Sequence, residues 1–84
     1  MNVMFSEDAW EEFCTIKANT PLAKAIRDTI KDIQRGNKLG KEEHLKYDMS
    51  GLLSRRLDKK NRLIYRVVGD TLQIVKCTAH YNDK

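Results

Sequence analysis

Residues 43–81, EHLKYDMSGLLSRRLDKKNRLIYRVVGDTLQIVKCTAHY, decide the fold of this 84-residue chain. Within this stretch, three runs have the composition and spacing of strands, namely Leu52–Leu57, Arg62–Val68 and Thr71–Ala79. The last two runs are joined by Gly69-Asp70, and Gly followed by Asp favours a type II′ hairpin turn. The sequence therefore predicts an antiparallel sheet at the centre of the molecule.

The beginning of the chain predicts a short strand and then a helix. Apolar residues alternate over Asn2–Phe5, and Ser6 is a good N-cap for a helix that begins at the next residue. An apolar stripe then recurs at helical spacing: Ala9, Trp10, Phe13, Cys14 and Ile16. We expect this helix to end near Ala18 and expect Trp10 and Phe13 to lie in the core.

A second helix is predicted from Thr20-Pro21, where Thr is the cap and Pro takes the first helical position. Its apolar face comprises Leu22, Ala23, Ile26, Ile30 and Ile33. Gly36 is placed to end it. The two helices share one apolar side, which only the later strands can cover. The predicted fold is one α+β domain over residues 1–84, with a short N-terminal strand and a two-helix hairpin packed on one face of a twisted antiparallel sheet.

Composition and charge narrow the class of protein. The formal net charge is +4, which makes a polyanion a reasonable partner, although a solvated basic surface would look the same. Cys14 and Cys77 lie far apart without CxxC spacing, so we expect reduced, buried thiols in a cytoplasmic protein, with no metal and no cofactor. We see no signal peptide and no apolar run near the ~18 residues that span a bilayer, so no membrane partner is expected.

The register of the first hairpin decides which side chains share a face. If the loop is Asp58–Asn61 alone, Leu57 faces Arg62; if it is one residue longer, Arg56 pairs with Arg62. The second register gathers more apolar surface on one side and is therefore favoured. In that register the helix-facing residues are Leu53, Leu63, Tyr65 and Val67. The residues on the opposite face are Ser54, Arg56, Arg62, Ile64 and Arg66.

The last strand requires an irregularity. A two-residue turn pairs Val67 with Leu72, but strict alternation from there would direct His80 into the core. A β-bulge near Val75–Lys76 would return Cys77 and Ala79 to the core and turn His80 toward the arginine face. We therefore predict such a bulge.

These residue types suit metal-free cleavage of RNA. The 2′-OH must lose a proton, the phosphorane carries added negative charge, and the 5′ oxygen needs a proton. Glu43, Arg56 or Arg62, and His80 supply a base, a cation and an acid. Tyr81 could stack on a base or cover the end of the sheet. Since each of these residues could equally lie on an ordinary surface, the chemistry alone leaves a basic α+β domain that either binds RNA or cleaves it.

Taken together, the motifs resemble the Txe/YoeB family of toxins, within the RelE-like group, from bacterial type II toxin–antitoxin modules. The resemblance covers nearly the whole chain and rests on FSEDAW (5–10), EHLK (43–46), SGLLSRRL (50–57), NRLIYRV (61–67) and CTAHY (77–81). It implies a microbial-ribonuclease-like fold and an mRNA endoribonuclease that acts in the ribosomal A site and inhibits translation. The implied partners are the ribosome with its mRNA, a YefM/Axe-like antitoxin, and operator DNA through the antitoxin complex only.

The resemblance also implies roles for individual residues. Glu43 matches the catalytic base, Arg62 the catalytic arginine and His80 the general acid. The implied substrate-binding positions are Arg56, Tyr81 and Lys46. The chain departs from the family pattern near the base, because Glu42 precedes Glu43 and His44 stands where Pro is common. The alternative interpretation is a basic RNA- or ribosome-binding domain that blocks translation without cutting.

Overall fold

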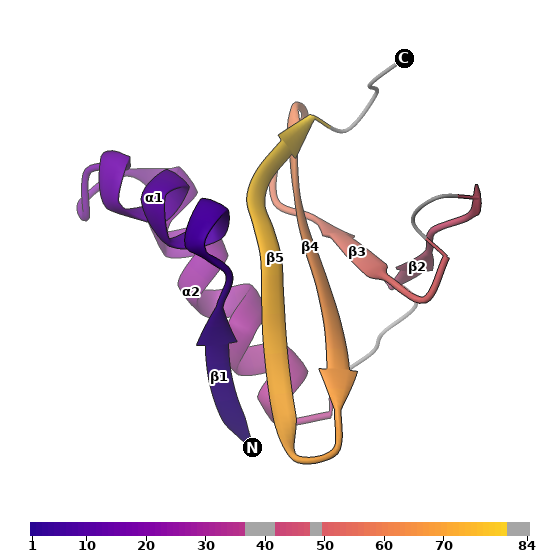
Figure 1. Cartoon of the computed structure of the whole chain (residues 1–84). Coiled ribbons are helices and arrows are strands. Elements are labelled where there is room, and N and C mark those ends of the chain that lie inside the picture. The colour runs from indigo at the N-terminus through magenta and orange to yellow at the C-terminus, as the bar shows by residue number, and fades with distance from the viewer. Residues whose placement is uncertain (37–41, 48–49, 81–84) are drawn as a thin grey trace.

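The computed structural model describes residues 1–36, 42–47 and 50–80, and it shows an α+β fold (Figure 1). In chain order its elements are β1 (Asn2–Phe5), α1 (Glu7–Thr15), α2 (Pro21–Gln34), β2 (Glu43–His44), β3 (Leu53–Arg56), β4 (Asn61–Val68) and β5 (Thr71–His80). The strands form one sheet in the order β1-β5-β4-β3-β2. The predicted α+β order is confirmed. The sheet is mixed, however, because β1 runs parallel to β5 while the other pairs are antiparallel.

Local signals place the helices. The Ser6 hydroxyl accepts a hydrogen bond from Ala9 N–H (3.0 Å), and the Thr20 hydroxyl accepts one from Ala23 N–H (3.3 Å), so both predicted caps are confirmed. Helix α1 ends at Thr15, earlier than the predicted Ala18. Its end is early because Ile16 turns to an extended conformation and packs against the core.

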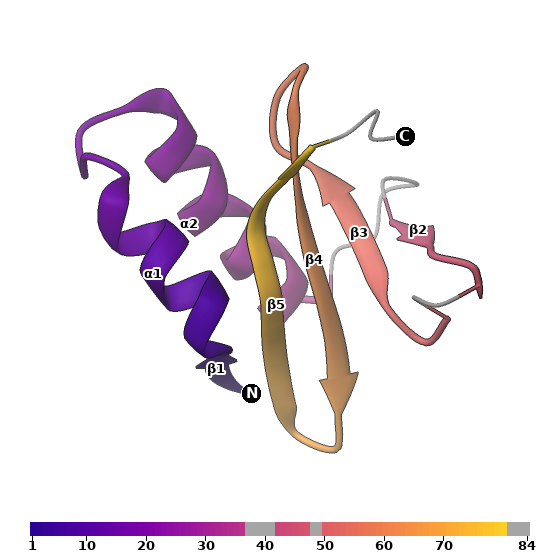
Figure 2. The same cartoon turned by 45° about the horizontal axis from the view of Figure 1, so that its top comes forward.

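Both helices cover the same face of the sheet (Figure 2). The buried cluster between them and the strands consists of Ala9, Ile26, Ile33, Leu63, Tyr65, Leu72, Ile74 and Cys77. Two core predictions were wrong: Trp10 is 53% exposed and Cys14 is exposed. The Trp10 ring lies edge-on to Phe5 (5.5 Å between centroids), on the flank of α1 rather than beneath it. Cys77 is buried as expected, and burial raises the pKa of its thiol to about 12.

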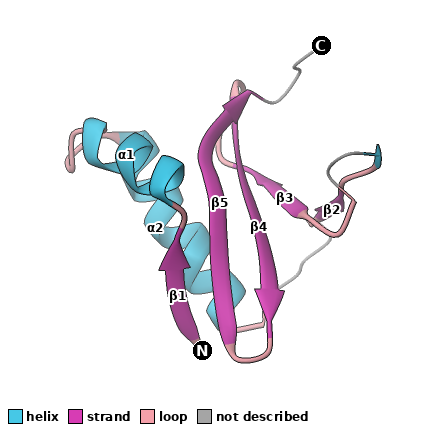
Figure 3. Ribbon diagram, viewed as in Figure 1, coloured by secondary structure: helices cyan, strands magenta, loops and turns pink. Residues whose placement is uncertain are grey.

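The predicted register of the hairpins is confirmed. Arg56 pairs with Arg62 across β3 and β4, and Val67 pairs with Leu72 across β4 and β5. Gly69 has a positive φ of 59°, whereas Asp70 is not among the positive-φ residues, as a type II′ turn requires. The long β4–β5 hairpin and the short strands beside it are shown in magenta in Figure 3.

Strand β5 is irregular where a bulge was predicted. Tyr65 pairs with Ile74 but Ile64 pairs with Lys76, which leaves Val75 as an extra residue. A second shift of the register, which was not predicted, lies between the Ile64–Lys76 pair and the Arg62–Ala79 pair. Because of that second shift, Ala79 shares the rung of Arg62. Cys77 and Ala79 are both buried, at 0% and 9% exposed, as predicted.

The described part of the chain contains no helix long and apolar enough to cross a lipid bilayer.

Candidate functional site

Three strands bring an acid and two arginines to one face of the sheet. Glu43 of β2 pairs with Ser54 of β3, and Arg56 of β3 pairs with Arg62 of β4. Paired residues project to the same side, and so do residues two apart in a strand, so these four side chains share a face. It is opposite to the face that Leu63 and Tyr65 bury against the helices. We call it the arginine face. Diagonal neighbours on such a face lie about 7–8 Å apart.

The arginine face is only partly open. Glu43 and Arg56 are exposed and Arg62 is half-buried, but Ser54 and Ile64, on the adjoining rung, are 0% and 1% exposed. Ser54 Oγ is buried without a hydrogen-bond partner among the described residues. The strand pairing confirms the prediction that one face carries Ser54, Arg56, Arg62, Ile64 and Arg66. The face is covered at its centre, where Ser54 and Ile64 lie.

Lys46 comes shortly after β2 and is exposed. Its segment is tied to the sheet because Leu45 N–H donates to the carbonyl of Leu52 (3.0 Å). The chain then turns at Tyr47, which has a φ of 60° and whose carbonyl accepts from Ser50 N–H (3.0 Å). Lys46 is therefore held near the end of β2, close in sequence to Glu43.

His80 ends β5, and its backbone pairs with Asn61, the residue before Arg62. The pairing brings residue 80 beside the arginine rung although the two are far apart in the sequence. The side chain of His80, and the whole of Tyr81, lie outside the described part of the chain, so their orientations stay predictions.

The adjacent Glu42 belongs to a different environment. Tyr65 Oη donates to Glu42 Oε1 (2.7 Å), and Arg55 Nε donates to Tyr65 Oη (3.2 Å). The Arg55 guanidinium also approaches Glu42 Oε1 (3.9 Å), and Arg55 is only 4% exposed. This network lies on the helix-facing side, whereas Glu43 shares the arginine face with Ser54.

Sequence reasoning missed this network. One signal was available: in the favoured register Arg55 alternates with Arg56 and so points toward the helices, where a buried guanidinium needs an acidic partner. Within residues 1–36, 42–47 and 50–80, His, Cys, Asp and Glu do not gather in threes as metal ligands.

In this environment the pKa of Tyr65 is raised to about 12. Burial is the main cause, the hydrogen bond to the Glu42 carboxylate adds to it, and Arg55 opposes both. Because the folded pKa is above the unfolded value of 10, the stabilisation is complete below pH 10 and is lost as the pH rises toward 12. A shift of about two pKa units corresponds to a change of up to about 3 kcal/mol.

We therefore expect Tyr65→Phe to be less stable than the parent at about pH 8 by about 1–2 kcal/mol, for the lost hydrogen bonds. That gap should narrow between about pH 10 and pH 11.5, because only the parent loses the Tyr65 contribution. Urea unfolding followed by the fluorescence of Trp10, the single tryptophan, would measure it. The Cys77 thiol titrates in both proteins and cancels in the difference. A gap that stays constant with pH would contradict the assignment.

Solved structures share this architecture. The YoeB/ParE toxin from Agrobacterium tumefaciens superposes with a TM-score of 0.86 at 31% identity, covering 96% of this chain and 100% of that one. The YoeB–YefM toxin–antitoxin complex from Staphylococcus aureus contains a chain that superposes with a TM-score of 0.83 at 33% identity, covering 96% and 98%. The fold is thus that of YoeB-like and RelE-like bacterial toxins.

The sequence comparisons give the family. Residues 5–81 match the model of the YoeB-like toxin of bacterial type II toxin–antitoxin systems. Toxin YoeB of Escherichia coli K12 is 36% identical over 84 residues, covering 96% of this chain and 100% of that protein. Toxin RelK of Mycobacterium tuberculosis is 39% identical over 83 residues, covering 95% and 98%. The chain belongs to the YoeB-like toxin family.

Proposed function

We propose that this toxin is an endoribonuclease that cleaves mRNA in the ribosomal A site and so stops translation. The observation that carries the proposal is the convergence of Glu43, Arg56 and Arg62, from three different strands, on the arginine face. The backbone of His80 ends β5 next to that rung. An acid, two guanidinium groups and an imidazole are the types of group that metal-free cleavage of a phosphodiester requires.

The reaction would run as an attack of the ribose 2′-OH on the adjacent phosphorus. Glu43 accepts the 2′-OH proton as the O2′–P bond forms. Arg62, assisted by Arg56, donates hydrogen bonds to the non-bridging oxygens, where negative charge develops. His80 donates a proton to the 5′ oxygen as the P–O5′ bond breaks. The products are a 2′,3′-cyclic phosphate and a free 5′-OH.

Glu43 is the better candidate for the base than Glu42. The carboxylate of Glu42 already accepts from Tyr65 and lies beside the Arg55 guanidinium on the helix-facing side. Glu43 is exposed and shares the face of both arginines. This difference supports Glu43 as the general base, a choice between two adjacent glutamates that the sequence alone left open.

The substrate and the partner are inferred from the surface of the site. Glu43 and Arg56 are exposed on the arginine face, so a ribosome that holds the mRNA against them would supply the positioning of the substrate. A relative from Staphylococcus aureus has been solved in complex with YefM. By analogy, a cognate antitoxin would cover the arginines with an acidic segment that folds on binding, and the complex would bind operator DNA. The site of action would be the cytoplasm, where mRNA is translated.

The test is cleavage by purified toxin on translating ribosomes, with primer extension to map new 5′ ends. We expect the parent to produce such ends and His80→Gln to lower their rate of formation by about 10²–10⁴-fold, as for loss of a general acid. The matched control is His44→Gln, an exposed histidine on β2, which should cleave as the parent does. If His80→Gln stops translation as well as the parent and no new ends form with either, the toxin acts by binding alone.

A further inference from the structure

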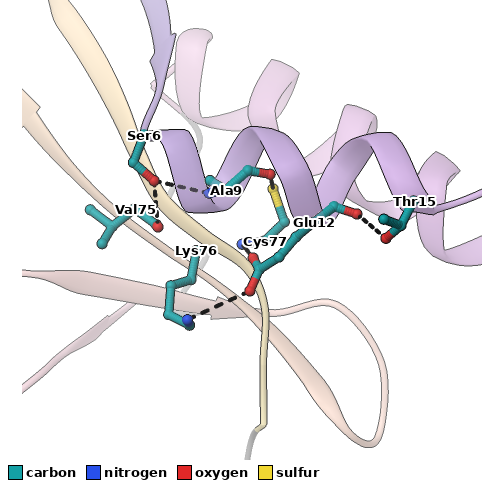
Figure 4. A network of polar contacts seen from close by, with 7 residues as sticks. All are labelled: Ser6, Ala9, Glu12, Thr15, Val75, Lys76 and Cys77. Carbon is teal, nitrogen blue, oxygen red and sulfur yellow. Dashed lines mark hydrogen bonds and ion pairs between the residues drawn. The ribbon is translucent and has the colours of Figure 1, made fainter.

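The outer edge of β5 is held by α1 where β1 ends. The parallel pairing of β1 with β5 stops at Phe5 and Ile74. Immediately beyond it, Ser6 N–H donates to the carbonyl of Ile74 (2.8 Å) and Ser6 Oγ donates to the carbonyl of Val75 (2.8 Å). The residue that caps α1 thus continues the edge contacts of β1 into the bulged part of β5 (Figure 4).

Glu12 holds the next two residues of β5. Its Oε1 accepts from the backbone N–H of Cys77 (2.7 Å), and its Oε2 lies 3.5 Å from Lys76 Nζ. The Cys77 thiol lies in turn against the carbonyl of Ala9 (3.5 Å). A partly buried backbone N–H at a sheet edge needs an acceptor, and a carboxylate is a strong one. Glu12 therefore acts as the edge partner at the irregular segment, as Figure 4 shows.

The irregular segment sets where β5 ends relative to the arginines. From Tyr65 to Arg62, β4 advances three residues, while β5 advances five, from Ile74 to Ala79. A regular ladder continued from the Tyr65–Ile74 pair would carry His80 past the end of β4, opposite Lys59. The two extra residues bring its backbone level with Asn61 instead, beside Arg62.

We propose that Glu12 is a positioning residue of this toxin: by binding Cys77 N–H from α1, it fixes the bulges of β5 and so the level at which the backbone of His80 pairs with β4, next to Arg62. This inference rests on the proposed nuclease function. Glu12 lies on α1, at the outer edge of β5, and acts on the site only through that strand. The ion pair with Lys76 is partly exposed and contributes little by itself, whereas the hydrogen bond to the backbone defines the register.

Two substitutions of Glu12 distinguish the effect of its side-chain length from the effect of its charge. Glu12→Gln keeps an oxygen at the same distance but loses the charge; Glu12→Asp keeps the charge but is one methylene too short to reach Cys77 N–H. We expect Glu12→Asp to lower kcat on translating ribosomes by about 10–100-fold with KM unchanged, as for a misplaced catalytic group. Glu12→Gln should retain most of the parent activity. The matched control is Glu11→Asp, at the exposed neighbouring position.

A control variant shows whether a loss of stability alone would lower kcat. Ile26→Val, in the buried core, destabilises the fold but leaves the contact of Glu12 with Cys77 N–H in place, and it should keep the parent kcat once folded. The register is also measured directly, as NMR contacts between the backbones of Asn61 and His80. These contacts should persist in Glu12→Gln and weaken in Glu12→Asp, whether or not the parent cleaves mRNA. If the parent makes no cuts, the nuclease proposal fails while the NMR comparison still tests the role of Glu12. The inference would be overturned if the contacts between Asn61 and His80 were equally strong in Glu12→Gln and Glu12→Asp. It would also be overturned if Glu12→Asp kept the parent kcat while Glu12→Gln lost it.

Discussion

Arg62→Ala is expected to lower the rate of mRNA cleavage on ribosomes by about 10²–10³-fold, the usual loss when one donor to a developing oxyanion is removed. Arg62 is half-buried on the middle strand of the arginine face, between Arg56 on β3 and Ala79 on β5. A guanidinium in that place can give two parallel hydrogen bonds to a phosphate and stays charged throughout the reaction. Arg62→Lys should recover only part of the rate, because an ammonium keeps the charge without the paired geometry.

The chain offers a close control for Arg62. Arg66 lies on the same strand and the same face, but it is exposed and its Nε donates to Gln73 Oε1 (2.6 Å). Arg66→Ala removes one positive charge from the same surface, so it reports the general electrostatic contribution. Single-turnover cleavage with both variants at two salt concentrations separates the effects. Similar losses in the two variants would mean that Arg62 only attracts RNA.

The second large effect concerns the adjacent glutamates: we expect Glu43 to act in cleavage and Glu42 to act in stability. Glu43→Gln is expected to lower cleavage by about 10²–10⁴-fold, as for loss of a general base, with stability within about 0.5 kcal/mol of the parent. Glu42→Gln is expected to do the opposite. It turns a charge-assisted hydrogen bond from Tyr65 into a neutral one, which should cost about 1–2 kcal/mol in the free energy of unfolding. Cleavage by the folded Glu42→Gln variant should remain near the parent rate.

Two measurements on Glu42→Gln and Glu43→Gln test whether the two glutamates have these different roles. Urea unfolding followed by Trp10 fluorescence gives stability, and primer extension on ribosomes gives cleavage. If Glu42→Gln loses cleavage while folded and Glu43→Gln keeps it, the two assignments must be exchanged.

Alternation along the strands was the most informative feature of the sequence. Since one face of β3 and β4 had to be apolar, the Leu and Tyr pattern selected the Arg56–Arg62 pairing among the possible registers, and the structure has that pairing. The break in the same alternation before Cys77 predicted a bulge, which the structure also has. The two arginines of the site could be placed on one face for that reason, whereas the pairing of Glu43 with Ser54 became known only from the structure.

Other features depended on what covers each surface, which a periodic pattern does not reveal. Trp10 has helical spacing with the core residues of α1, but nothing among the described residues encloses that flank of the helix, so its ring stays half in solvent. The contact of Glu42 with Tyr65 and Arg55 joins three segments whose relative placement is set only in the packed structure. The second shift in β5 involves Glu12 on a helix far away in sequence, and strand patterns carry no trace of it.

The parallel pairing of β1 with β5 has a consequence for the order in which the molecule forms. Residues such as Ser6 and Val75, which meet at that seam, are separated by 69 positions. The strand synthesised first must therefore wait for the strand synthesised last among the described elements, while the β4–β5 hairpin can close locally. We expect nascent chains stalled before Thr71 to remain protease-sensitive at the N-terminus, and early protection there would contradict this. A toxin whose sheet is complete only after β5 has been synthesised has little opportunity to attack the ribosome while that ribosome is still making the earlier strands.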